Sequence, residues 1–100
     1  KAYLFKIGLF LEVIFNMAET RTGVIAIVVE NPGAVQEKLN SYISAAGHII
    51  IGRMGVPYRE KNESVIALLV DGTTDAINSL TGQLGTLPGV NVRSALTKEK

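Results

Sequence analysis

The side chains able to do chemistry are few and dispersed in this sequence. The chain contains one histidine and no cysteine, which excludes disulfides, cysteine-ligated zinc, iron–sulfur clusters and thiol nucleophiles within it. The acidic residues fall at predicted turns and helix ends and form no carboxylate pair of the kind that acid–base catalysis requires. We therefore predict that the protein is not an enzyme and that it holds no cofactor.

The single histidine, His48, is the one candidate metal ligand. It opens a predicted strand and lacks the neighbouring His, Cys, Asp or Glu residues that a metal site needs. The sequence therefore predicts no metal site. The remaining way to build one is an oligomer whose symmetry brings several copies of His48 together.

Two segments could bind a small ligand. The first, Asn31–Gly33, joins a predicted strand to a predicted helix, whose first N–H groups are free to bind an anion, and the alternative is an ordinary turn. The second, Gly52–Tyr58, contains glycines that indicate a bulge or a close backbone approach in a strand. Its arginine-containing hairpin is either a ligand or partner contact or a twisted, solvated tip. The candidate ligand-binding residues are Asn31, Pro32, Gly33, Gly52, Arg53, Tyr58 and Arg59.

Composition limits the classes of partner. The 100 residues fit one domain, and 47% of them are hydrophobic, which predicts that a partner covers some apolar surface. The net charge of +1 provides no field for nucleic acid or for an acidic substrate. Arg53, Arg59 and Lys61 form a small basic cluster, but no helix-turn-helix or aromatic RNA-binding strand accompanies it. Direct nucleic acid binding is therefore not expected.

The segment Lys1–Asn16 is apolar and aromatic, with Lys6 and Glu12 inside it. It is shorter than the ~20 apolar residues of a membrane-spanning helix, and it has no clear signal-peptide cleavage site. No membrane association is expected. We predict a non-native N-terminal extension before a natural start at Met17, with an amphipathic helix or an added strand as the alternatives. Residues 17–100 then form the domain.

An internal repeat organises this domain. The octet VIAIVVEN from Val24 and the octet VIALLVDG from Val65 match at most positions, and in the same register Leu39 aligns with Leu80. The similarity spans a strand and the helix that follows it. This pattern indicates a duplicated supersecondary unit.

Hydrophobic periodicity predicts six elements. Strands are expected over Gly23–Glu30, His48–Val56, Glu63–Val70 and Val90–Leu96, and helices over Ala34–Ala46 and Asp75–Leu84. This order predicts an α+β fold, a ferredoxin-like βαββαβ sandwich with a four-stranded antiparallel sheet and two helices on one face. Thr73 or Thr74 can cap the second helix. Gly82 and Gly85 predict early fraying of that helix or a contact too close for a Cβ.

The two central strands predict an interface. Val24–Val29 and Val65–Val70 are apolar at every position, whereas a strand with one solvated face alternates apolar with polar residues. The face of the sheet that the helices leave bare must therefore also be covered. A second copy of the chain is the expected cover, with Lys1–Asn16 as the alternative.

The strand–turn–helix segment Val28–Ala34, VVENPGA, resembles the ACT domain, an amino-acid-sensing regulatory module. This resemblance implies side-by-side pairing of sheets and a small effector bound between subunits, near Asn31, Pro32 and Gly33.

A second resemblance spans Met17 to about Thr97. Gly52–Tyr58 (GRMGVPY), Ser64–Ala67 (SVIA) and Leu80–Gly85 (LTGQLG) together resemble a small family named as regulators of the iron-only hydrogenase system. That family label rests on genomic context and implies no particular ligand. Its members are related in fold to the ligand-binding domain of the nickel-responsive repressor. The nickel ligands of that domain are missing here apart from His48, so nickel sensing is not implied.

Pattern and resemblance together predict a cytoplasmic regulatory domain, a homodimer or homotetramer, that senses a small effector at a subunit interface and is linked to the iron-only hydrogenase system. Arg53 and Arg59 are the candidate anchors for an anionic group of that effector. The alternative is a ligand-free interaction or oligomerisation module.

Overall fold

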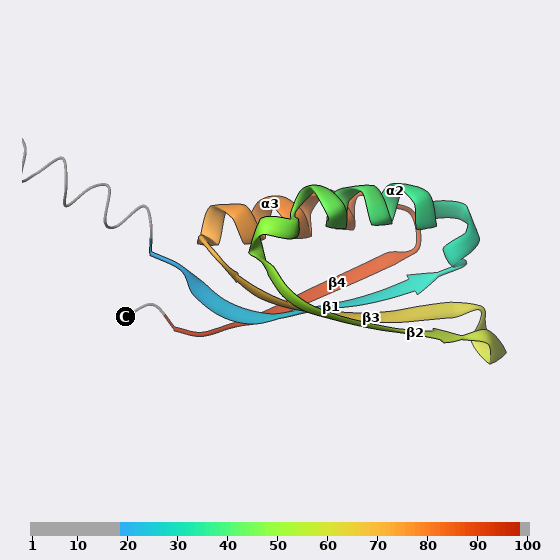
Figure 1. Ribbon diagram of the computed structural model, residues 1–100. Helices are drawn as coiled ribbons and strands as arrows, with labels where there is room; N and C mark the ends of the chain where they lie inside the picture. Colours follow the sequence, from blue (N-terminus) through green and yellow to red (C-terminus); the bar gives the residue numbers. More distant parts are fainter. Residues whose placement is uncertain (1–18, 99–100) are drawn as a thin grey trace, which may run out of the picture.

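The computed structural model of the chain describes residues 19–98. Its elements follow the order β-α-β-β-α-β: β1 (Arg21–Glu30), α2 (Pro32–Ala45), η1 (Gly47–Ile49), β2 (Ile50–Tyr58), η2 (Arg59–Lys61), β3 (Glu63–Gly72), α3 (Thr74–Gly85) and β4 (Val90–Leu96). The four strands form one antiparallel sheet in the order β2-β3-β1-β4. Both helices lie on one face of this sheet (Figure 1). The predicted ferredoxin-like fold is confirmed, and β4 has the predicted bounds.

The two repeat octets lie side by side at the centre of the sheet. Strands β1 and β3 are antiparallel neighbours, with Ala26 opposite Ala67 and Val28 opposite Val65. The aligned leucines of the two helices, Leu39 and Leu80, are both 2% exposed. The repeat therefore corresponds to two halves that meet in the sheet and share one core.

Alternate side chains of the central strands form the core beneath the helices, because successive residues of a strand point to opposite faces. The buried strand residues are Ile25, Ile27, Val29, Ile66, Leu68 and Val70. The helices contribute Val35, Leu39, Ile43, Ile77, Leu80 and Leu84. Burial of each such side chain favours folding by roughly 1.5–3 kcal/mol.

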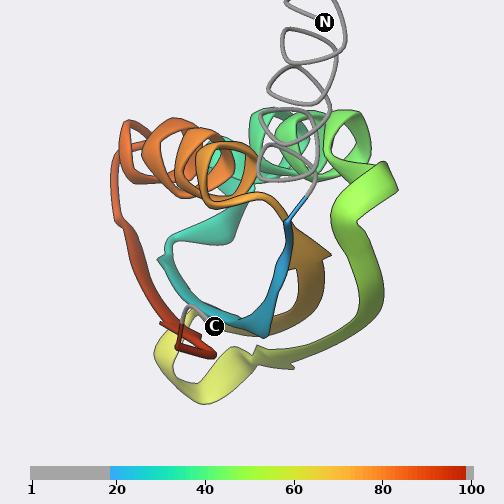
Figure 2. The same cartoon turned by 90° about the vertical axis from the view of Figure 1, so that its left-hand side faces the viewer.

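The opposite face of the sheet, called the open face below, carries the intervening residues of the same strands. No helix of the described residues 19–98 covers it, as the end view in Figure 2 shows. Register places the large apolar side chains Val24, Met54, Val56, Val65 and Leu69 on this face. Val65 remains 46% exposed and Met54 67% exposed. Residues 19–98 by themselves thus leave bare the apolar face that the sequence predicts to be covered.

The second strand differs from its predicted bounds. His48 does not open β2 but lies in the short helix η1, where Ile49 N–H donates to the Ala46 carbonyl at 3.0 Å. This tight turn buries Ile49, which is 5% exposed, and it delays strand pairing until Ile50. At its other end β2 continues through Pro57. Because β2 is an edge strand, a residue that lacks an N–H donor is tolerated there.

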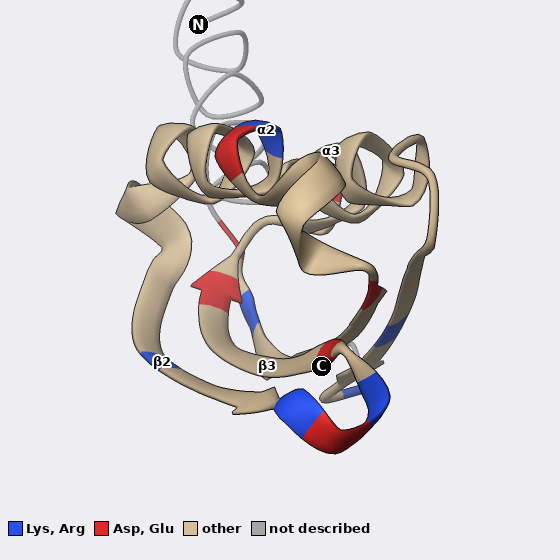
Figure 3. Ribbon diagram, turned by 90° about the vertical axis from the view of Figure 1, so that its right-hand side faces the viewer, with Lys and Arg blue, Asp and Glu red and all other residues tan. Residues whose placement is uncertain are grey.

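The hairpin between β2 and β3 ends in η2. Its charged residues are Arg59, Glu60 and Lys61, and Figure 3 shows both signs of charge gathered at this tip. The predicted basic cluster is therefore interrupted by a carboxylate. It does not form a purely positive surface.

The glycines of α3 do not have the role predicted for them. The helix continues without fraying to Gly85, and a Cβ placed on Gly82 or on Gly85 would meet no atom of the described chain within 4 Å. Neither of the two expectations, early fraying or a close contact, is therefore correct for residues 19–98.

Thr73 caps the N-terminus of α3. Its Oγ1 accepts a hydrogen bond from the Ala76 N–H at 3.1 Å, so the cap is Thr73 and not Thr74. We expect Thr73→Ala to lower the free energy of unfolding by about 1 kcal/mol, because one N–H at the helix start loses its acceptor. Urea denaturation measures this change. Thr73→Ser keeps the hydroxyl and should retain most of the stability; equal losses in the two variants would contradict the cap.

Candidate functional site

A cavity of about 190 Å³ lies between the first turns of α2 and the edge strand β2. Its walls come from α2, β2 and β3: Pro32, Gln36, Leu39, Asn40, Arg53, Gly55, Val56, Pro57, Ser64 and Ile66. The core residues Leu39 and Ile66 line its inner side. Polar groups on its wall belong to Gln36, Asn40, Arg53 and Ser64.

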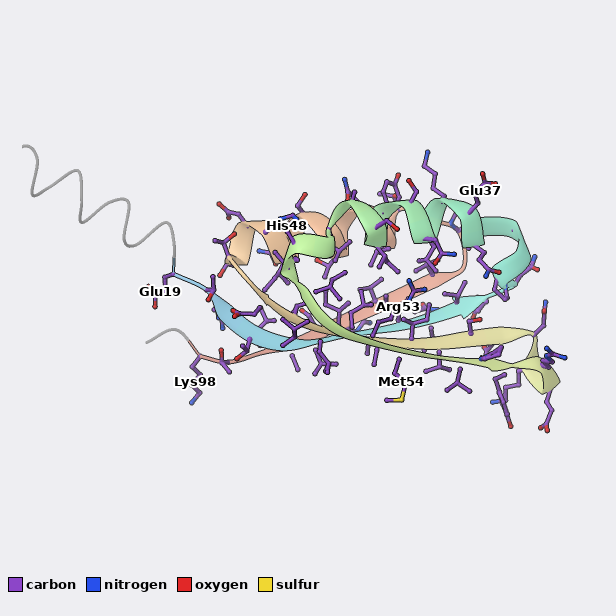
Figure 4. The ribbon with its side chains drawn as sticks, viewed as in Figure 1. Glu19, Glu37, His48, Arg53, Met54 and Lys98 are labelled. Carbon is purple, nitrogen blue, oxygen red and sulfur yellow. The ribbon has the colours of Figure 1, made fainter. Side chains whose placement is uncertain are left out.

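Arg53 reaches the cavity because of its register in the sheet. It pairs with Leu68, a core residue, so its side chain leaves β2 on the helix side. Its Nη2 donates a hydrogen bond to Asn40 Oδ1 of α2 at 3.0 Å. Figure 4 shows Arg53 between the sheet and the helices, whereas the adjacent Met54 lies on the open face. Within residues 19–98 this is the one hydrogen bond of the guanidinium, and its other N–H groups can donate to a ligand.

The two glycines of β2, Gly52 and Gly55, lie on opposite faces of the sheet. Gly55 lines the cavity opposite Ile66, and an added Cβ would be 3.7 Å from Ile66 Cγ1, an ordinary contact. The sheet therefore does not require glycine there, and the missing side chain leaves the cavity wall open. Gly52 pairs with Leu69 on the open face, and so the structure places it outside the cavity. The predicted bulge is present, since the register shifts between Ile50 and Gly52.

The turn before α2 is tied to the hairpin tip. Asn31 has a φ of 53° and Asn62 a φ of 51°, a left-handed conformation that asparagine tolerates better than most residues. The Asn31 N–H donates to the Asn62 carbonyl at 3.1 Å, and the Asn62 side-chain amide donates to Asn31 Oδ1 at 3.5 Å. Pro32 alone of the predicted turn residues lines the cavity. Gly33 has an open surface position, with nothing within 4 Å of an added Cβ.

The remaining predicted residues lie at the hairpin. Tyr58 donates its hydroxyl hydrogen bond to Glu60 Oε2 at 3.2 Å and pairs with Glu63 on the open face. Arg59 belongs to η2. Neither of them lines the cavity. The structure therefore brings together two of the predicted site residues, Pro32 and Arg53, and places the others around them.

Three polar residues of the lining, Gln36, Asn40 and Ser64, were not predicted from the sequence. Gln36 and Asn40 are four residues apart, so they share one side of the helix, and that spacing was the available signal. It is not specific, because exposed helix faces are polar in general.

Possible metal ligands are dispersed among the described residues. Among them no group of three or more His, Cys, Asp and Glu side chains could hold a metal ion. His48 is exposed and lines a separate cavity of about 310 Å³ between the end of α2 and α3. Within residues 19–98, no helix is long and apolar enough to cross a membrane.

Fold and site define a small ferredoxin-like domain in which a cavity lies between α2 and the edge strand β2, with Arg53 on its wall. The chain belongs to the TM1266-like family, whose description reads "Iron-only hydrogenase system regulator, putative", and the family match covers residues 21–94. Its structure is similar to that of TM1266 from Thermotoga maritima, with a TM-score of 0.77, 32% sequence identity, and coverage of 80% of this chain and 100% of that one.

A more distant similarity is to apo CPII from Thiomonas intermedia K12, a nitrogen regulatory PII-like protein. The TM-score is 0.48 and the identity 14%, over 79% of this chain and 95% of that one. No curated protein matches the chain.

Proposed function

We propose that this protein is a cytoplasmic, non-enzymatic regulatory domain that assembles with itself as a homodimer or homotetramer and senses a small effector at the subunit interface. Membership of the hydrogenase-regulator family supports a regulatory role. The open face is the surface through which copies pack. The Asn31–Gly33 turn and the Gly52–Tyr58 stretch flank the effector, and Arg53, on the cavity wall, is the anchor for its anionic group. Arg59, the second anchor expected from the sequence, lies outside the cavity in η2.

The observation that carries this proposal is the double role of β2. Along this strand Arg53 and Gly55 line the cavity, while the intervening Met54 lies on the open face. Val56 contributes to both, since it lines the cavity and also pairs with Val65 on the open face. An effector that changes the position of this edge strand therefore changes the packing surface as well.

Coupling of this kind needs no catalysis. An effector that binds one subunit arrangement more tightly than another shifts the population toward that arrangement. The size of the shift equals the difference between its binding free energies to the two arrangements.

Native mass spectrometry of the purified chain, without added ligand, tests the proposal. We expect a dimer or tetramer, with part of the population carrying a reproducible small-molecule mass. A monomer at all concentrations would contradict self-assembly through the open face. An oligomer that never shifts in mass or in subunit arrangement with any small molecule would favour the alternative function.

That alternative is a ligand-free interaction module. It is favoured by one observation, the width of the exposed apolar surface, which extends over β1, β2 and β3. Contiguous apolar surface of this kind marks interaction sites on small proteins. Arg53→Gln separates the two functions, because it should weaken effector binding without changing the assembly only if the protein is a sensor.

A further inference from the structure

The described wall of the cavity between α2 and β2 carries a positive charge and no negative charge. Arg53 is the one charged residue among the described residues that line it, and none of these lining residues is acidic. Amide and hydroxyl groups of Gln36, Asn40 and Ser64 accompany it, and the rest of the wall is apolar. We propose that this cavity binds a small aliphatic carboxylate, in preference to an amino acid or a nucleotide. The inference rests on the proposed sensing function and names the chemical class of the effector.

The hydrogen-bond acceptor of the Arg53 guanidinium is the neutral side-chain oxygen of Asn40. A carboxylate would be a stronger acceptor for the same donor. The hydrogen bond from Arg53 to Asn40 Oδ1 at 3.0 Å joins a charged donor to an uncharged oxygen. A carboxylate presents two oxygens in the geometry that the guanidinium fork matches, and such charge-assisted pairs are about twice as strong as neutral ones. The incoming carboxylate therefore replaces the Asn40 oxygen. The Asn40 side-chain amide then has an N–H group to donate to the bound anion.

The volume limits the size of the ligand. The cavity between α2 and β2 has a volume of about 190 Å³. It is smaller than the ~300–1,000 Å³ pockets that hold drug-sized ligands. The volume favours a ligand smaller than a nucleotide. An acid of six non-hydrogen atoms, such as butanoate, has a suitable size, and its alkyl chain can contact Leu39, Pro57 and Ile66.

The charge distribution separates a simple acid from an amino acid. An amino acid of the same size brings an ammonium group, which loses hydration on entering the cavity and needs an anionic partner in return. None of the described lining residues provides a carboxylate for it. The cavity should therefore bind butanoate more tightly than the zwitterion alanine, although the two molecules have equal numbers of non-hydrogen atoms.

The test is an NMR titration of the full ¹⁵N-labelled chain with sodium butanoate at constant ionic strength. We expect saturable shifts of the Arg53 Nε–H and of the Asn40 side-chain amide, and at least a tenfold lower affinity in Arg53→Gln, because a hydrogen bond to a charged group is lost. Lys38→Gln is the matched control. Lys38 is on the same helix as Asn40, and its Nζ lies 5.8 Å from the Tyr42 ring centre, outside the cavity.

Asn40→Asp provides an independent, nearly isosteric variant. It places a permanent carboxylate against Arg53 and should also reduce butanoate affinity at least tenfold, with the fold retained in the amide spectrum. Unchanged butanoate binding in both Arg53→Gln and Asn40→Asp would overturn the proposal, as would alanine binding as tightly as butanoate. If butanoate fails to bind while native mass spectrometry still finds an oligomer with an adduct, this inference fails and the proposed function stands. Binding of butanoate to a protein that is always monomeric supports the carboxylate site and contradicts the interface.

Discussion

Replacing Leu68 with alanine should lower the free energy of unfolding by roughly 2–5 kcal/mol. Leu68 is fully buried in β3, opposite Ile25 of β1 and beneath the helices. Its truncation removes apolar contacts and leaves a cavity that the close-packed neighbours fill only in part. Urea denaturation followed by circular dichroism measures the loss. For a domain of this size the change is a large share of the total stability.

The next residue in the sequence supplies the matched control. Leu69 has the same side chain but points to the open face, where it is 45% exposed. In a monomeric background Leu69→Ala should cost about 1 kcal/mol, less than the loss at Leu68, since nearly half of the Leu69 side chain already faces water. Equal losses at Leu68 and Leu69 in a monomer would contradict the assignment of the two faces.

Val65→Lys should convert the proposed oligomer into a monomer. Val65 lies near the middle of the open face, between Val28 of β1 and Val56 of β2. In a monomer, the aliphatic part of a lysine can lie along the sheet while its ammonium stays in water. In a packed interface the same charge would be desolvated without a partner, which costs several kcal/mol. We expect the subunit dissociation constant to rise by more than about a hundredfold.

Sedimentation velocity over a range of protein concentrations measures this change. Ser44→Lys is the control, because Ser44 is exposed on α2 in the helical layer and adds the same charge away from the open face. Dissociation by Val65→Lys alone would assign the interface to the open face. Loss of the oligomer with Ser44→Lys, and not with Val65→Lys, would assign it to the helical layer.

Local patterns in the sequence were sufficient for the order and type of the elements. The apolar octets define β1 and β3, and their match predicts two equivalent halves, which the pairing of Ala26 with Ala67 confirms. The turn at Pro88-Gly89 marks the start of β4 at Val90. These features depend on neighbours within a few residues, so periodicity and turn chemistry are enough to locate them.

The predicted ends of the elements were less accurate where contacts with distant parts of the chain determine them. The expected strand from His48 begins at Ile50, because burial of Ile49 against the core favours a tight turn after α2. No local signal distinguishes that turn from an extended start. The predictions for Lys1–Asn16 lie outside the described residues 19–98.

Only the tertiary structure determines which face of the sheet the Arg53 side chain points to. The sequence by itself determined that Arg53 lies in the second strand of a ferredoxin-like sheet with one bare apolar face. Strict alternation from the inward-facing Ile50 would have put Arg53 on that bare face, but the extra residue of the bulge reverses it and turns the side chain toward Asn40. The pairing of β2 with β3 determines the bulge. The position of α2 on the sheet determines the contact between Arg53 and Asn40. Both depend on segments distant in the chain, which is why the cavity could not be derived from the sequence.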